Sequence, residues 1–284
     1  MFTVSYERPD LKALSKDSFV ADMHYHTAYS HDCKTPVRDI LKLARKNGLS
    51  VAFTDHNRIG GVREARSQKN VLVIPAVELC SKEGKEVIPY FYDAGQLEDF
   101  YARRVAPRLK DKNPMRSART PIKMVDLLAW LAEEECVVTL PHPFALQPRK
   151  SHPFFTNPKR DALLRHVHAL EVFNSQEPRR SNLSATGWAV QLRKGVTAGS
   201  DGHLLHRLGA GVVATNATTI EEHLNAVRKA RVAMHGLEMK AHERAWNYAR
   251  TSVKNKLQNG VRSGLQKGLS FPARVSRRVL RLHR

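Results

Sequence analysis

Two histidines stand one residue apart at the end of an apolar run, in the segment Asp22–Cys33, DMHYHTAYSHDC. On an extended chain, residues i and i+2 project to the same side, so the imidazoles of His24 and His26 can hold one ion together. Asp32, on the loop that follows, adds a carboxylate that can hold a second ion. Neutral imidazoles mixed with carboxylates favour Zn²⁺, Mn²⁺ or Fe²⁺ over Ca²⁺ and Mg²⁺, which prefer oxygen ligands.

Further potential ligands stand at the ends of other short apolar runs. They are Asp55 and His56 after residues 50–54, Glu78 at the end of 71–78, His142 after 136–140, and Asp201 and His203 after 195–198. In a parallel barrel all strand carboxyl ends open onto one face, so these side chains are expected to meet at one rim. The set exceeds the needs of one tetrahedral ion. Two or three divalent ions would use it, and such clusters stabilise the attacking and leaving oxygens of phosphoryl displacement.

The elements that must position these residues follow a regular pattern, because short apolar runs alternate with segments of helical periodicity. This pattern predicts repeated β-α units. The predicted strands are 19–23, 50–54, 71–78, 86–92, 136–140, 169–173 and 195–198, and the predicted helices are 36–47, 96–110, 122–135, 181–193 and 219–229. The first helix has clear boundaries, with Thr35 as N-cap, Pro36 in the first turn and Gly48 just past its end.

Composition limits the class of protein. The 284 residues are 42% hydrophobic without a long apolar run, which allows a large buried core and excludes a membrane-spanning helix. Glu7 and Asp10 stand where a signal peptide would be basic and then apolar, so we expect no export. Three widely spaced cysteines argue against a disulfide framework and fit a cytoplasmic location.

The formal charge of +20 is concentrated at the end of the chain, because residues 240–284 hold twelve Lys or Arg and one acid. We therefore expect a catalytic part over residues 1–239 and a basic tail over 240–284. Apolar residues recur every four positions from Val253 to Leu269, which predicts an amphipathic basic helix. Such a helix can bind an anionic membrane surface, making the protein peripheral to the membrane, or nucleic acid, or it can pack on the barrel.

The residues also carry a family resemblance. The segments DMHYHTAYSHD, AFTDHN, AVEL, LPHP and GSDGH, in this order, resemble the successive metal-binding motifs of the PHP (polymerase and histidinol phosphatase) superfamily. The resemblance covers roughly residues 18–235. It implies an α/β fold, a distorted (β/α)7 barrel, with a di- or trinuclear metal centre for phosphoester hydrolysis. The basic C-terminal helical extension inferred above would follow this barrel. The ligands that it implies are His24, His26, Asp32, His56, Glu78 as the bridging carboxylate, His142, Asp201 and His203.

The sequence departs from the family pattern at two places. Many members have a histidine after the bridging glutamate, where this chain has Glu86, which is either a substitute ligand or the mark of a weaker site. His31 and Asp32 are adjacent at a position that varies in the family between His and Asp. The spacing from His24 favours Asp32 as the ligand, with His31 as a neighbour or substrate contact.

The resemblance also implies a mechanism in which a metal-bound hydroxide attacks phosphorus in line. His203 or His142 is a candidate for protonating the leaving oxygen, although ligation competes with that role. Asp55, beside a ligand, is expected to orient a ligating histidine. Arg58 is placed either to meet a substrate phosphate or to remain a solvated loop arginine.

Three functions are consistent with these features. The leading hypothesis is a metal-dependent phosphoesterase that hydrolyses a phosphate ester of a small metabolite or nucleotide, with two or three Zn, Mn or Fe ions. One alternative is a nuclease acting on DNA or RNA, with the basic tail holding the strand. The other is a non-catalytic metal-binding or membrane-associated module.

Overall fold

The computed structural model describes residues 1–68, 71–109, 119–146 and 149–244. Residues Met1–Glu238 form one compact unit, and a second unit begins at Met239. The amphipathic helix predicted from Val253 to Leu269 lies outside the described residues. The division of function between residues 1–239 and 240–284 therefore stays a prediction.

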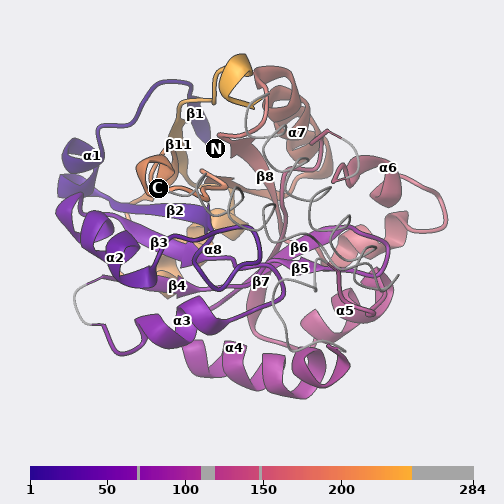
Figure 1. Cartoon of the computed structure of the whole chain (residues 1–284). Coiled ribbons are helices and arrows are strands. Elements are labelled where there is room, and N and C mark those ends of the chain that lie inside the picture. Colours follow the sequence, from indigo (N-terminus) through magenta and orange to yellow (C-terminus); the bar gives the residue numbers. More distant parts are fainter. Residues whose placement is uncertain (69–70, 110–118, 147–148, 245–284) are drawn as a thin grey trace, which may run out of the picture. The chain divides into compact units, whose positions relative to one another are not determined.

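The strands of the first unit form two sheets, which occupy the centre of Figure 1. In spatial order, the six-stranded sheet contains β1 (Thr3–Ser5), β11 (Ala233–Gly236), β10 (Gly211–Thr215), β2 (Phe19–Tyr25), β3 (Ser50–Phe53) and β4 (Val73–Pro75). The five-stranded sheet contains β5 (Leu79–Cys80), β6 (Glu86–Phe91), β7 (Cys136–Leu140), β8 (Ala169–Asn174) and β9 (Gly195–Gly199).

The direction of each strand decides whether its first or its last residue lies at the edge of the sheets where the candidate ligands stand. β2, β3 and β4 are parallel to one another, as are β7, β8 and β9, but β6 is antiparallel to β7. The first residue of β6, Glu86, therefore lies at the edge where β7 ends. Single bridges from Tyr25 to Gly202 and from Ala76 to Tyr90 link the two sheets. These pairings give a mixed α/β fold; the described pairs form no continuous closed ladder, so the (β/α)7 barrel stays a prediction.

Helices surround the strands in Figure 1. They are α1 (Leu11–Asp17), α2 (Val37–Lys46), α3 (Gly60–Ala65), α4 (Ala94–Phe100), α5 (Met124–Leu131), α6 (His152–Phe155), α7 (Arg179–Leu192) and α8 (Ile220–Arg228). Within the described part of the chain, no helix combines the length and apolar character that crossing a bilayer requires.

The predicted helices differ from the observed ones at their ends, and two of the differences have a visible cause. Pro36 rather than Thr35 is the N-cap of α2, and the Thr35 hydroxyl instead donates to the carbonyl of His203 at 3.2 Å. The helix predicted over 96–110 is α4, which begins after the N-cap Asp93 and continues into a π-helical turn, Tyr101–Val105. The sequence pattern also missed β1, β10 and β11, which are short and pair at one end of the six-stranded sheet.

Every residue of β2 is buried, including a carboxylate in its middle. Asp22 accepts hydrogen bonds from the amide and hydroxyl of Ser200, at 2.9 and 2.6 Å, and from the amide of Gly209 at 2.9 Å. Burial raises the pKa of Asp22 to about 6, against the effect of these donors. The carboxylate therefore fixes β2 to the loop that follows β9, and both segments supply candidate ligands.

Two glycines give a direct test of how closely β2 and β9 must approach. A Cβ on Gly199 would lie 2.3 Å from the His24 Cβ, whereas a Cβ on Gly187, in the middle of α7, would meet nothing within 4 Å. We expect Gly199→Ala to destabilise the fold by about 1–3 kcal/mol, because backbone must move. Gly187→Ala should stabilise it by about 0.5–1 kcal/mol through helix propensity. Thermal denaturation of both variants measures the difference, and shifts in the same direction would contradict this account.

Candidate metal centre

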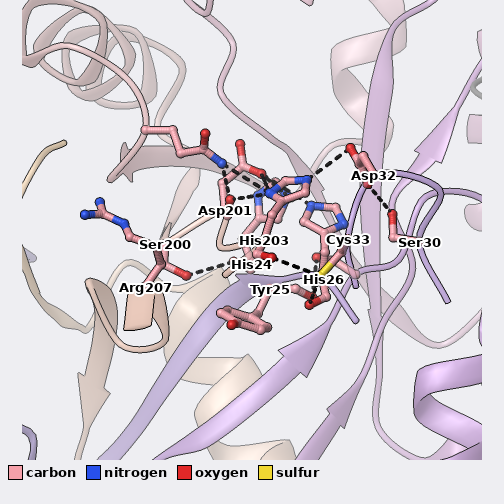
Figure 2. Close-up of polar contacts among 12 residues, drawn as sticks. His24, Tyr25, His26, Ser30, Asp32, Cys33, Ser200, Asp201, His203 and Arg207 are labelled. Atoms are coloured by element: carbon pink, nitrogen blue, oxygen red, sulfur yellow. Dashed lines mark hydrogen bonds and ion pairs between the residues drawn. The ribbon is translucent and has the colours of Figure 1, made fainter. Parts of the chain in front are cut away.

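The predicted ligands come together at the edge where β2, β3, β7 and β9 end and β6 begins. Nine side chains contribute: His24, His26, Asp32, His56, Glu78, Glu86, His142, Asp201 and His203. They fall into four overlapping groups whose ligand atoms lie within 4.8 Å of one another in each group. Figure 2 shows part of this convergence, with His24, His26, Asp201 and His203 close together and Asp32 opposite His203.

The most deeply buried of these side chains are spaced as metal ligands are. Nε2 of His24 lies 3.6 Å from Oε2 of Glu78 and 3.6 Å from Oδ1 of Asp201. Nε2 of His26 lies 3.6 and 3.3 Å from the same two oxygens. A tetrahedral ion with bonds of about 2.1 Å separates its ligands by about 3.4 Å. The four imidazole–carboxylate distances are close to that separation, and His24 belongs both to a group with His26 and Glu78 and to a group with His142 and Asp201.

A second group lies nearer to solvent. Oδ2 of Asp32 is 3.0 Å from Nε2 of His203 and 3.3 Å from Nε2 of His56. The side chains of Asp32 and His203 are 27% and 22% exposed, whereas His24 and His26 are fully buried. The His31 ring lies beside the His56 ring, with centroids 5.0 Å apart. Of the two adjacent candidates, Asp32 is thus the one that faces two of the imidazoles predicted to bind metal.

Glu78 lies between the groups. Its Oε2 faces His24 and His26 and lies 2.9 Å from Nδ1 of His56, and its Oε1 lies 3.2 Å from Nε2 of His142. Glu86 lies on the His142 side, with Oε2 3.7 Å from the same nitrogen. The two oxygens of Glu78 thus face different imidazoles, as they would in a carboxylate that bridges two ions.

Several buried atoms of these side chains have no hydrogen-bond partner among the described residues. They include Nε2 of His24 and His26, Oε2 of Glu78 and Glu86, and Oδ1 of Asp201. Buried polar atoms are nearly always satisfied, because an unpaired buried atom costs free energy. A divalent cation bound between facing nitrogen and oxygen lone pairs would give each of them a partner. The residues present therefore fit divalent ions.

The ionisation states of two buried carboxylates also fit metal binding. Burial alone would raise the pKa of Glu78, but His56 and His24 hold it well below its usual value. Burial would also raise the pKa of Asp201, but Arg149 and His24 hold it well below the usual range. Both carboxylates are therefore ionised near neutral pH, the state in which carboxylates bind metal ions.

Residues behind the ligands fix their orientation. The Nδ1–H of His24 donates to Oε1 of Glu171 at 2.9 Å, which leaves Nε2 free to bind an ion. Oε2 of Glu171 accepts from the amide of His142 at 2.7 Å and from the Asn174 side chain at 3.0 Å. The Nδ1–H of His203 donates to the carbonyl of Asp201 at 2.9 Å, and the Gln176 amide contacts the same carbonyl.

Two predicted catalytic residues lie beside the ligands. The Asp55 carboxylate accepts from the amide and hydroxyl of Thr27, at 2.6 and 2.7 Å, so its hydrogen bonds fix the turn after His26 rather than an imidazole ring. The Arg58 side chain bonds the hydroxyl of Tyr101, which itself donates to the Asn57 carbonyl at 3.0 Å. The roles expected for Asp55 and Arg58 stay predictions.

Sequence reasoning missed the roles of Glu171 and Arg149. Glu171 is a charged residue within the apolar run ALEVFN, and an acid inside a buried strand is a signal that could have identified it. Arg149 donates to Oδ2 of Asp201 at 2.9 Å from a loop with no recognisable pattern. Only the folded chain shows that contact.

Comparison with known proteins agrees with this geometry. Residues 22–242 match the PHP domain model, so the chain belongs to the PHP domain family, whose members are metal-dependent hydrolases. An uncharacterized protein of Methanocaldococcus jannaschii is 26% identical over 205 residues, which are 71% of this chain and 72% of that protein.

Two solved structures share the fold at low identity. One is the lesion-specific endonuclease Q of Pyrococcus furiosus, with a TM-score of 0.60 and 18% identity, over 76% of this chain and 57% of that one. The other is a two-domain protein of Bacteroides vulgatus that contains a predicted PHP-like metal-dependent phosphoesterase. It has a TM-score of 0.54 and 17% identity, over 82% of this chain and 68% of that one. At such identities the likeness is one of fold.

Glu171 gives a test of how the ligands are oriented. We expect Glu171→Gln to lower the affinity for Mn²⁺ by about 10–100-fold, because the amide cannot accept from both the His24 ring and the His142 amide. Chelator competition measures the affinity, and Glu135→Gln, at an exposed glutamate, is the control. An unchanged affinity for Mn²⁺ would show that Glu171 does not orient the ligands.

Proposed function

We propose that the protein is a metal-dependent phosphoesterase that hydrolyses a phosphate ester of a small metabolite or nucleotide. The observation that carries the proposal is the convergence of five imidazoles and four carboxylates, with buried lone pairs left facing one another. We assign the ligand roles to the nine side chains named above, including Glu86, and expect Zn, Mn or Fe. Bound ions would lower the pKa of a coordinated water and neutralise charge on the phosphoryl oxygens.

Net charge favours an anionic substrate. The carboxylates of Asp32, Glu78, Glu86 and Asp201 bring four negative charges, whereas three divalent ions bring six positive ones. A site filled in this way is positive, and a phosphomonoester dianion neutralises the excess. Two ions would leave the ligands neutral, with the nearby guanidinium of Arg149 still available to the substrate.

Exposure separates the roles of the imidazoles. His24 and His26 are fully buried and His142 is nearly so, whereas the His203 side chain is 22% exposed. A substrate can therefore reach His203 more readily than His142. We assign the proton for the leaving oxygen to His203 in the form in which its Nε2 carries a proton and does not bind an ion. Asp55 would act indirectly, by holding the turn that carries His26 through Thr27.

Two ligand variants test the proposal. We expect His24→Ala and Asp201→Ala each to reduce hydrolysis of p-nitrophenyl phosphate by at least about 100-fold, because the deepest ion loses a ligand. His206→Ala, at an exposed histidine three residues after His203, should keep wild-type turnover. Circular dichroism checks that the variants are folded. Wild-type turnover in either ligand variant would contradict the assignment, and the absence of metal-dependent activity in the wild type would favour a non-catalytic module.

A nuclease is the second candidate, and the distribution of charge favours it. Residues 240–284 carry twelve basic residues and one acid, which suits a phosphate backbone. An anionic membrane surface is the other proposed partner of this tail. A cytoplasmic location, with or without peripheral membrane binding, stays a prediction.

Removal of the tail distinguishes these possibilities. If the tail holds nucleic acid, binding of DNA or RNA to the full chain falls steeply with salt and is lost when residues 240–284 are deleted. Hydrolysis of p-nitrophenyl phosphate should remain, because the metal ligands all precede residue 240. Fluorescence anisotropy across a salt series measures the binding. Equal binding by the full and shortened chains would exclude this role for the tail.

A further inference from the structure

An arginine lies among the acids of the centre on its solvent side. Nη2 of Arg149 is 2.9 Å from Oδ2 of Asp201 and 3.4 Å from Oε1 of Glu177. The Arg149 side chain is 35% exposed, whereas those of Asp201 and Glu177 are 1% and 10% exposed. The guanidinium therefore reaches from the opening of the site to a buried carboxylate.

Asp201 divides its oxygens between two tasks. Oδ2 accepts from Arg149 and, at 3.3 Å, from the Asn174 side chain. Oδ1 faces Nε2 of His24 and of His26 and has no hydrogen-bond partner among the described residues. One carboxylate thus separates the guanidinium from the deepest candidate ion.

This position carries an electrostatic conflict. A guanidinium keeps its proton at any physiological pH, so Arg149 is a permanent cation. A permanent cation beside a divalent ion repels that ion and weakens its binding. Asp201 offsets part of this repulsion, and a substrate anion that contacts both cations would offset more of it.

We propose that Arg149 binds the phosphoryl group of the substrate at the opening of the metal centre. Both hydrogen bonds of Arg149 to described residues leave from Nη2, and the remaining guanidinium N–H groups can donate to phosphate oxygens in a planar fork. The identity of the ligand as a phosphate rests on the proposed phosphoester hydrolysis. Two other arginines near the site have different partners, because Arg58 bonds Tyr101 and Arg207 donates to Ser175.

Arg149→Gln tests the inference in the full-length protein, because it removes the charge and keeps a hydrogen-bonding side chain. We expect two changes of opposite sign. Affinity for Mn²⁺ should rise by about tenfold, since a repelling charge is gone. Affinity of the Mn²⁺-loaded protein for inorganic phosphate should fall by about tenfold or more, since a charged donor is lost. Isothermal titration calorimetry with Mn²⁺ and then with phosphate measures both.

Two control variants separate charge from shape. Arg149→Lys keeps the charge without the fork, so Mn²⁺ affinity should stay near wild type while phosphate affinity falls. Arg66→Gln removes an exposed arginine that pairs with Glu98, and it should change neither affinity.

The outcomes are distinguishable. A parallel loss of Mn²⁺ and phosphate affinity in Arg149→Gln would mean a structural role, and unchanged phosphate affinity would mean that Arg149 does not bind the anion; either overturns the inference. Failure of the Mn²⁺-loaded wild type to bind phosphate overturns it as well. If Arg149-dependent phosphate binding is found without ester hydrolysis, the proposed function fails and the inference about Arg149 stands.

Discussion

The structure depends on the cost of placing several ionised carboxylates in one buried volume. Asp201 and Glu78 are almost inaccessible to solvent, and so is Glu171 directly behind them. Neighbouring carboxylates repel one another strongly where water is excluded, so positive charge must lie within the same buried volume. One guanidinium provides part of it in the protein itself, and divalent cations held by the unpaired nitrogen and oxygen atoms would provide the rest.

Three further buried carboxylates, which are not predicted to bind metal, hold the surrounding chain in place. Asp22 joins β2 to the loop after β9, Asp55 holds the turn after His26, and Glu171 fixes the ring of His24. Each accepts hydrogen bonds from amide or side-chain donors far away in the sequence. Their hydrogen bonds therefore stabilise the backbone conformations at which the predicted ligands meet. This explains why Asp22 and Glu171 stand inside strands that are otherwise apolar.

Much of the site could be predicted because its ligands stand at strand ends, where an apolar run changes to polar residues. His24, His142 and Asp201 are examples, and parallel strands bring them to one edge. Direction and tertiary contacts could not be predicted so easily. Glu86 reaches the edge only because β6 is antiparallel, so its first residue rather than its last is in place. Thr35 gives up the expected helix cap for the carbonyl of His203, a partner 168 positions away.

The hairpin of β5 and β6 has a consequence for the order in which the centre assembles. Glu78 and Glu86 flank β5 and the turn of this hairpin and are close in sequence, so the hairpin alone brings them near each other. Short loops close quickly, whereas distant segments meet slowly because loop closure costs more entropy. The acidic half of the site can thus form early in folding. The contact between His24 and Asp201 joins segments far apart in the chain, so forming it costs more loop-closure entropy than forming the hairpin.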